Sequence, residues 1–120
     1  MTVPRPLTCS WSRPSPQRAC LTPDGDLDFD ASDQVLDEVV RFLAENPRTR
    51  ELTVDCRRIG FCDSYGLSVL LMIRRRTQAA GVTLQLVNRG PALEKLLRVT
   101  NTLRHLTESS VPSREEKFDR

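Results

Sequence analysis

The group with the clearest chemical potential in this sequence is the hydroxyl of Ser64, in the stretch "DSYG" at 63–66. The preceding run, "RIGFC", is typical of the end of a strand, and an apolar pattern of helical spacing follows at once. An aspartate at a helix start accepts a hydrogen bond from a free N–H group of the first turn. The order of residues therefore predicts that Asp63 caps a helix and that Ser64 presents its hydroxyl on the first turn.

That hydroxyl is a candidate for phosphorylation. A phosphoryl group on Ser64 would add about −1.5 to −2 charge at neutral pH. The helix N-terminus would tolerate this charge, whereas Asp63 beside it and a close-packed partner would not. Gly66 removes a side chain from the same turn, so that another backbone or another protein could approach closely. Taken alone, these residues are also explained by the ordinary chemistry of a helix start.

Catalysis and cofactor binding are not expected. Ser64 has no base close in sequence, and the only histidine, His105, lies far along the chain. The stretch "GPALEK" at 90–95 lacks the glycine and lysine spacing of a phosphate-binding loop. The four cysteines form no CxxC or CxxH pair, so a zinc site is not expected. We predict no catalytic residue, no metal and no cofactor, and a protein that is not an enzyme.

Acidic residues alternate with other residue types in "DGDLDFDASD" at 24–33. The alternation of Leu27 and Phe29 with aspartates predicts a strand with one buried face and one solvated acidic face. The same acids resemble the start of a calcium loop. However, Phe29 and Val35 stand where that loop needs a glycine and a bidentate glutamate, so the solvated strand is the favoured interpretation.

The charge of the chain is balanced overall but unevenly distributed. The 18 basic and 16 acidic residues leave a formal net charge of +2, which does not by itself indicate nucleic-acid binding. Between Asp24 and Glu45 there are eight acidic residues and one basic residue, Arg41. Between Arg48 and Arg76 there are seven basic and three acidic residues. Such polarity favours a specific protein partner, although solvated helix faces also look this way.

The composition is that of an ordinary soluble domain, with 38% apolar and 28% charged residues. The first residues lack the apolar core of a signal peptide, and no apolar run has the length of a membrane span. We therefore expect a reduced, cytoplasmic protein without a membrane partner. In it, Cys56 and Cys62 would pack as small apolar residues.

The beginning of the chain is predicted to be irregular. Residues 1–17 contain four of the eight prolines and little apolar periodicity, which predicts a mobile proline-rich arm. A short strand is expected at 18–21 and a turn at "TPDG", residues 22–25. A second strand then covers 26–30.

A helix is expected next, capped by Asp30 or Ser32 and ended by Pro47. Its apolar stripe comprises Val35, Leu36, Val39, Val40, Phe42 and Leu43. The stretch "ELTVDC" that follows, at 51–56, is typical of a buried strand.

The second half of the chain alternates helices and strands. The "DSYG" helix has an apolar core face and stops near Gly81. A strand with alternating apolar residues covers 82–87, and a third helix begins near Pro91. Helices between successive strands predict an α/β sheet. We expect one domain at 18–108, with a short last element, and a frayed polar tail at 109–120.

Five short motifs follow one another in a defined order. They are "GDLD" at 25–28, "VDC" at 54–56, "DSYGL" at 63–67, "GVTLQLV" at 81–87 and "LLRVTNT" at 96–102. Each is weak alone, but the ordered set covers about 80 residues. Together they resemble a STAS domain of the anti-sigma factor antagonist family, also called anti-anti-sigma factors.

The resemblance implies the STAS fold, an α/β fold with a four- or five-stranded mixed sheet and helices packed largely on one face. It implies a partner that is an anti-sigma factor with serine kinase activity and a histidine-kinase-like ATPase fold. In that family the unphosphorylated antagonist binds this kinase and frees a sigma factor, which regulates transcription. The kinase phosphorylates the serine that matches Ser64, and a metal-dependent serine phosphatase reverses the modification. No direct contact with nucleic acid is implied.

The resemblance also suggests a partner-binding surface. Its expected residues are Asp24, Asp26, Asp28, Asp63, Ser64, Tyr65 and Gly66. Asp63 would cap the helix and orient Ser64, Gly66 would permit close approach, and the acids at 24–28 would attract a basic partner surface.

One residue departs from the family pattern at the centre of the motif. Tyr65 stands where a second serine or threonine is usual, which makes the rim of the site bulkier and aromatic. An alternative function is a STAS scaffold or transporter-associated subunit that binds an ATPase constitutively, without phosphorylation. A sensor of nucleotides or small ligands is a third possibility, which no phosphate-binding loop supports.

Overall fold

The computed structural model describes residues 7–99 of the 120-residue chain. The elements, in chain order, are β1 (Thr8–Ser15), β2 (Arg18–Leu27), α1 (Ser32–Glu45), β3 (Glu51–Asp55), β4 (Ile59–Cys62), α2 (Ser64–Ala79), β5 (Thr83–Val87) and α3 (Pro91–Val99). The short element expected after residue 100 and the tail at 109–120 lie outside the described residues, as do residues 1–6 of the expected arm.

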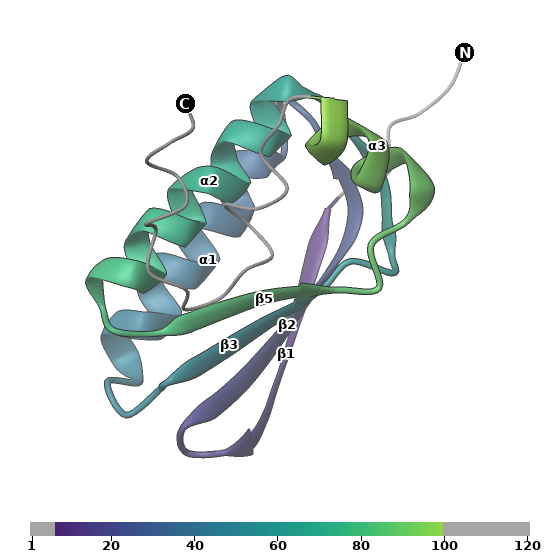
Figure 1. Ribbon diagram of the computed structural model, residues 1–120. Helices are drawn as coiled ribbons and strands as arrows, with labels where there is room; N and C mark the ends of the chain where they lie inside the picture. Colours follow the sequence, from purple (N-terminus) through teal and green to yellow (C-terminus); the bar gives the residue numbers. More distant parts are fainter. Residues whose placement is uncertain (1–6, 100–120) are drawn as a thin grey trace, which may run out of the picture.

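The five strands form one mixed sheet. Its order is β1-β2-β3-β5, and β4 pairs with the C-terminal part of β2. β1 is antiparallel to β2, whereas the β2–β3, β2–β4 and β3–β5 pairs are parallel. α1 and α2 lie side by side on one face of the sheet, and α3 lies near the end where α2 begins (Figure 1). The predicted α/β fold, with a mixed sheet and helices largely on one face, is confirmed.

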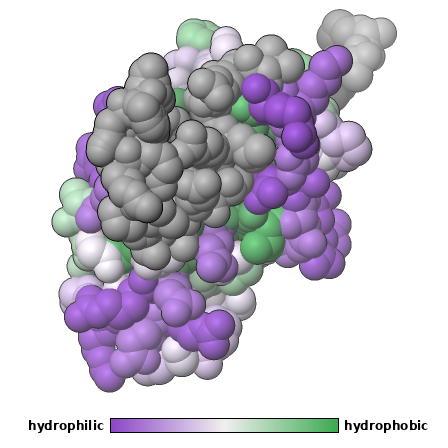
Figure 2. Space-filling view, in the orientation of Figure 1, coloured by the Kyte–Doolittle hydropathy of each residue, from purple (hydrophilic) through white to green (hydrophobic). Residues whose placement is uncertain are grey.

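The core is aliphatic and lies between the sheet and the α1–α2 layer. Its completely buried or nearly buried side chains include Leu21, Leu27, Val35, Val39, Leu52, Val54, Leu70, Ile73, Leu84 and Leu97. On β5 the predicted alternation holds, since Leu84 and Leu86 are buried while Gln85 between them is exposed. The visible outer face is largely hydrophilic, with only small apolar areas (Figure 2).

The proline-rich N-terminal stretch forms a strand where a mobile arm was expected. β1 pairs with β2 from Thr8 to Ser15. The residues that hold this N-terminal stretch occur every fourth position along α1 and its C-cap: Gln34, Glu38, Phe42 and Asn46. Trp11 stacks on Phe42 with ring centroids 4.0 Å apart, and its Nε1 donates to Glu38 Oε1 at 2.8 Å. The indole thus supplies the apolar anchor that periodicity does not reveal.

The turn predicted at 22–25 is absent, because β2 is one continuous strand. β2 pairs with β3 as far as Leu21 and with β4 from Gly25 onward. Pro23, which lacks an N–H group, lies where the strand changes partner. Gly25 has φ = 141°, a backbone conformation that favours glycine, and the β2–β4 pairing is irregular between Gly25 and Leu27. Pro23 and Gly25, which are typical of turns, thus lie in β2 where its pairing is interrupted or irregular.

Two other helix signals are confirmed. Gly81, with φ = 73°, follows the end of α2, and Pro91 is the first residue of α3. The stretch "RIGFC", which the sequence indicated only as the end of a strand, forms the separate strand β4, whose four residues carry too little periodicity to define it alone. Within residues 7–99 the structure contains no helix with both the length and the apolar character needed to span a bilayer.

Candidate functional site

The start of α2 is built by Asp63. β4 ends at Cys62, and the Asp63 N–H donates to the Leu27 carbonyl at 3.1 Å, which joins this corner to the end of β2. The Asp63 carboxylate accepts a hydrogen bond from the Gly66 N–H at 2.8 Å, and its carbonyl accepts from the Leu67 N–H at 3.0 Å. The predicted aspartate cap is confirmed.

Ser64 is the first residue of α2 and its side chain is exposed. The first turn of α2 contains no acidic residue, so its N-terminal N–H groups add a favourable field for negative charge at this position. Ser68, one turn later, is also exposed, but its hydroxyl donates to the Tyr65 carbonyl at 2.8 Å. Ser64 is thus an accessible hydroxyl at a helix end that accommodates an anion.

Gly66 lies against the backbone of the protein's own sheet. It is buried, and a Cβ atom at this position would lie 2.2 Å from the Leu27 carbonyl oxygen and 3.0 Å from Cys62 Sγ. The missing side chain therefore permits close approach of the protein's own β2 and β4. Approach of another backbone, one of the two expected roles of Gly66, is thus seen in the structure, and its contact with a partner stays a prediction.

Tyr65 lies half-buried between the starts of the two long helices. Its hydroxyl donates to Asp33 Oδ1 at 2.7 Å, which connects the first turn of α2 to the first turn of α1. Its ring meets the Phe29 ring edge to face, with centroids 5.3 Å apart and planes inclined by 66°. The hydrogen bond to Asp33, with desolvation and the carboxylate charge adding to it, raises the pKa of Tyr65 above its ordinary value of 10.0.

Phe29 is exposed, although the alternating pattern placed it on the buried face with Leu27. β2 ends at Leu27, so the period of two no longer applies two residues later, and 71% of Phe29 is accessible. Phe29 and Asp33 are the two site residues that the sequence interpretation missed. They meet Tyr65 across 32 or more residues of chain, and no local pattern reports such a contact.

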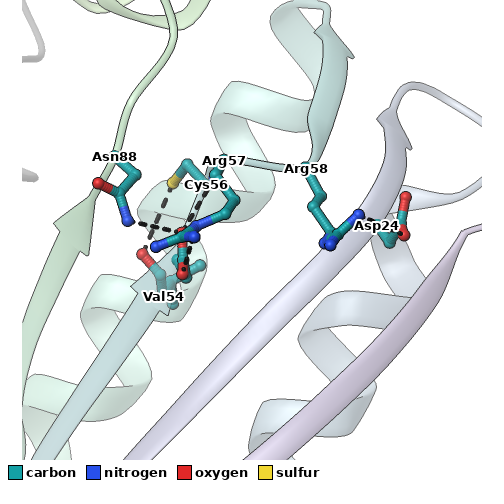
Figure 3. Close-up of polar contacts among 7 residues, drawn as sticks. Asp24, Val54, Cys56, Arg57, Arg58 and Asn88 are labelled. Carbon is teal, nitrogen blue, oxygen red and sulfur yellow. Dashed lines mark hydrogen bonds and ion pairs between the residues drawn. The ribbon is translucent and has the colours of Figure 1, made fainter.

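The three aspartates of β2 and its end are half-buried and serve different purposes. Asp24 forms an ion pair with Arg58 at 3.9 Å, in the turn before β4 (Figure 3). Asp26 lies on β2, between Asp24 and Asp28 in the sequence. The Asp28 carboxylate accepts from the N–H groups of Asp30 and Ala31, both at 3.0 Å.

Asp28 therefore performs the role expected of Asp30 or Ser32 at the start of α1. The residue before the helix is Ala31, which has no side-chain cap, and the Ser32 hydroxyl donates back to the Asp28 carbonyl at 2.7 Å. Asp28 is also next to Leu27, whose carbonyl binds Asp63. The structure thus brings Asp28 toward the Ser64 corner, while Asp24 faces the Arg58 turn.

A second polar cluster lies at the carboxyl ends of β3 and β5. Asp55 Oδ1 accepts from Asn88 Nδ2 at 3.0 Å, from the Arg57 N–H at 3.1 Å and from Arg57 Nε at 3.3 Å (Figure 3). Desolvation alone would raise the pKa of Asp55, but these bonds and the Arg57 charge outweigh it and lower that pKa below 3.8. Asn88 has φ = 55°. The cluster fixes the two turns beside the sheet.

The cysteines near the site are packing residues. Cys56 is buried and Cys62 is half-buried against Gly66. Burial raises the pKa of each thiol to about 12. Both thiols are therefore protonated at neutral pH and poor nucleophiles.

The arrangement at the start of α2 is suited to binding and to modification of a hydroxyl. Among residues 7–99, no three His, Cys, Asp or Glu side chains are placed to hold a metal ion. The site consists of an exposed hydroxyl on a helix N-terminus, the exposed Phe29 ring in contact with the half-buried Tyr65 ring, and several carboxylates. Such a surface suits recognition by another protein.

Comparison with known proteins agrees with this geometry. The model of the STAS-domain family described as "Mlab, STAS domain" matches residues 13–108. No curated protein sequence matches the chain.

Several solved structures share the fold. An anti-sigma factor antagonist from Mycobacterium paratuberculosis is 18% identical with a TM-score of 0.72, covering 88% of this chain and 87% of that chain. Unphosphorylated SpoIIAA, an anti-sigma factor antagonist, is 18% identical with a TM-score of 0.68, covering 79% and 82%. The murine anion transporter Slc26a9 is 18% identical with a TM-score of 0.65, covering 72% of this chain but 14% of the transporter. The family model spans most of the chain, and the mixed sheet with its capped α2 fits it: the chain belongs to the STAS domain family.

Proposed function

We propose that this chain is an anti-sigma factor antagonist controlled by phosphorylation of Ser64. In its unphosphorylated form it binds an anti-sigma factor that is also a serine kinase of the histidine-kinase-like ATPase fold, and so frees a sigma factor. The observation that carries the proposal is the position of Ser64, exposed on the first turn of α2 directly after the Asp63 cap. A cytoplasmic serine phosphatase would reverse the switch.

The chemistry of the corner supports a switch that leaves the fold intact. A phosphoryl group on Ser64 would sit at the N-terminus of a 16-residue helix, whose dipole favours negative charge. The same group would hold water beside the exposed Phe29 ring and the half-buried Tyr65 ring, and it would add charge next to Asp63. A close-packed partner would have to desolvate that phosphate, so binding would weaken while the domain stays folded.

Phosphorylation is the first test. The full chain, incubated with ATP and a candidate kinase of this class, should acquire one phosphate, located on Ser64 by mass spectrometry. Ser64→Ala should remain unmodified, whereas Ser68→Ala, which removes the exposed serine one turn later, should be modified like wild type. Equal phosphate on wild type and Ser64→Ala would refute the assignment.

Binding is the second test. Ser64→Asp should weaken the complex with the same kinase, and Ser68→Asp should weaken it less, because that residue lies one turn farther from the helix start. Circular dichroism should show that both variants remain folded. Unchanged dissociation constants for Ser64→Asp would argue that charge at this position is not the switch.

A second candidate function is a STAS scaffold or transporter-associated subunit that binds an ATPase constitutively. The likeness to part of an anion transporter favours it. It predicts that Ser64→Ala loses no function and that the purified chain retains transporter subunits. The antagonist function predicts a different result, namely that Ser64→Ala cannot be switched off and stays bound to the kinase.

A further inference from the structure

Phe29 and Tyr65 form a fixed aromatic pair beside Ser64, called here the aromatic pair. Phe29, at 71% accessible, is the most exposed large hydrophobic side chain among residues 7–99. Its ring is nevertheless held in place, because it contacts the Tyr65 ring edge to face and the Tyr65 hydroxyl is bound to Asp33. An exposed ring that is already ordered loses little conformational entropy on binding, which is the property of a contact residue.

The surroundings of the aromatic pair are acidic. Between Asp24 and Asp37 the chain has six aspartates and no basic residue. Asp33 is itself in contact with the aromatic pair, and Asp30, exposed, follows Phe29 directly. An aromatic face beside carboxylates attracts a cation, and a planar guanidinium satisfies both groups at once by stacking on the ring and donating to the carboxylates.

The chain already makes this type of contact elsewhere. The Arg13 guanidinium lies 6.0 Å from the centroid of the Phe42 ring and donates to Asn46 Oδ1 at 2.7 Å. Among residues 7–99, Phe29 has no arginine over its ring. An arginine of the chain itself therefore contacts the Phe42 ring, whereas no arginine among residues 7–99 contacts the Phe29 ring.

We propose that the aromatic pair is the anchor for an arginine side chain of a basic protein partner. The inference rests on the proposed partner-binding function and adds the chemistry of the contact: a guanidinium stacked on Phe29, with the carboxylates of Asp30 and Asp33 around it. Tyr65 then acts as a specificity-determining residue, because it orients the Phe29 ring. The proposal thus gives a role to Tyr65, the residue that departs from the family pattern.

The test compares two peptides of equal charge. Hexa-arginine and hexa-lysine should both bind the full chain at low salt through the acidic surface, but the arginine peptide should bind about fivefold more tightly, because only guanidinium stacks well on the ring. Calorimetric titration measures both dissociation constants. Phe29→Leu keeps every charge and should reduce the arginine preference to nearly onefold.

Phe61→Leu is the matched control, because it removes another exposed aromatic side chain, 54% accessible, from β4. It should keep the arginine preference. Absence of binding, equal affinity of wild type for the two peptides, or a preference that survives in Phe29→Leu would each overturn the inference. None of these outcomes bears on whether a kinase modifies Ser64, so the proposed function stands or falls separately.

Discussion

A Cβ atom on residue 66 would lie 2.2 Å from the carbonyl oxygen of Leu27 and 2.9 Å from its Cβ. Real Cβ atoms do not approach other atoms this closely, so α2 can begin against the end of β2 only with glycine at this position. The same carbonyl accepts the Asp63 N–H. The glycine of "DSYG" thus allows the helix start, and with it Ser64, to be fixed to the sheet.

Gly66→Ala should destabilise the domain by about 2 to 3 kcal/mol, because backbone atoms of β2 must move to admit the methyl group. This loss outweighs the gain of about 1 kcal/mol that alanine normally brings to a helix. Urea unfolding followed by the fluorescence of Trp11, the only tryptophan, measures it. Gly90→Ala, where a Cβ would meet no atom within 4 Å, should lose much less. Similar losses for both variants would contradict the steric argument.

Trp11→Leu should reduce the free energy of unfolding by about 2 kcal/mol, because it removes the stacked ring on Phe42 and the hydrogen bond to Glu38. Urea unfolding followed by circular dichroism measures the change. Ser10→Ala, on the exposed face of the same strand, should have almost no effect. If the two variants were equally stable, the N-terminal stretch would behave as the arm that its composition predicts.

The contrast between β1 and β5 shows what sequence patterns can predict. The apolar residues of β5 alternate with a period of two, which is local information, and Leu84 and Leu86 are indeed buried. The bounds of β5 were therefore predicted to within one residue. β1 contains one proline, Pro14, and depends on a contact between Trp11 and α1 that spans 27 residues. Local composition therefore indicated disorder, while long-range packing determined the strand.

In the candidate site too, the features that depend on neighbouring residues were predicted, and the contacts between distant segments were not. Asp63 and Ser64 lie in one turn, so the cap and the exposed hydroxyl were evident from residue order. Phe29 and Asp33 reach Tyr65 only because α1 and α2 begin side by side, which no single stretch encodes. The backbone that Gly66 lies against is that of Leu27, and the local sequence does not give this position.

The Asp55 cluster should make stability depend on pH in the acid range. Its folded pKa is lowered below 3.8, so its stabilisation is fully present above that value and is lost as the pH falls through the folded pKa. Asp55→Asn should therefore cost about 1 kcal/mol near pH 7, with the gap from wild type shrinking toward pH 3. Urea unfolding at several pH values measures the gap. Glu45→Gln, which removes an exposed carboxylate of α1 and leaves this cluster intact, is the control. A gap for Asp55→Asn that stays constant in acid would contradict this assignment.

The bond between Tyr65 and Asp33 should be visible in the titration of the tyrosine itself. Tyr65 is the only tyrosine, so the ultraviolet absorbance of phenolate reports it alone. Its pKa is raised above 10.0 chiefly by the bond to Asp33; the bond therefore stabilises the fold below about pH 10 and is lost as the pH rises through the folded pKa. Asp33→Asn should lower the midpoint toward 10.0. Asp37→Asn removes the same charge from an exposed position one turn later and should shift the midpoint less. Equal shifts would mean that the negative charge of α1 as a whole, and not this hydrogen bond, raises the pKa of Tyr65. The hydrogen bond would then not hold Tyr65 in the position that orients the Phe29 ring.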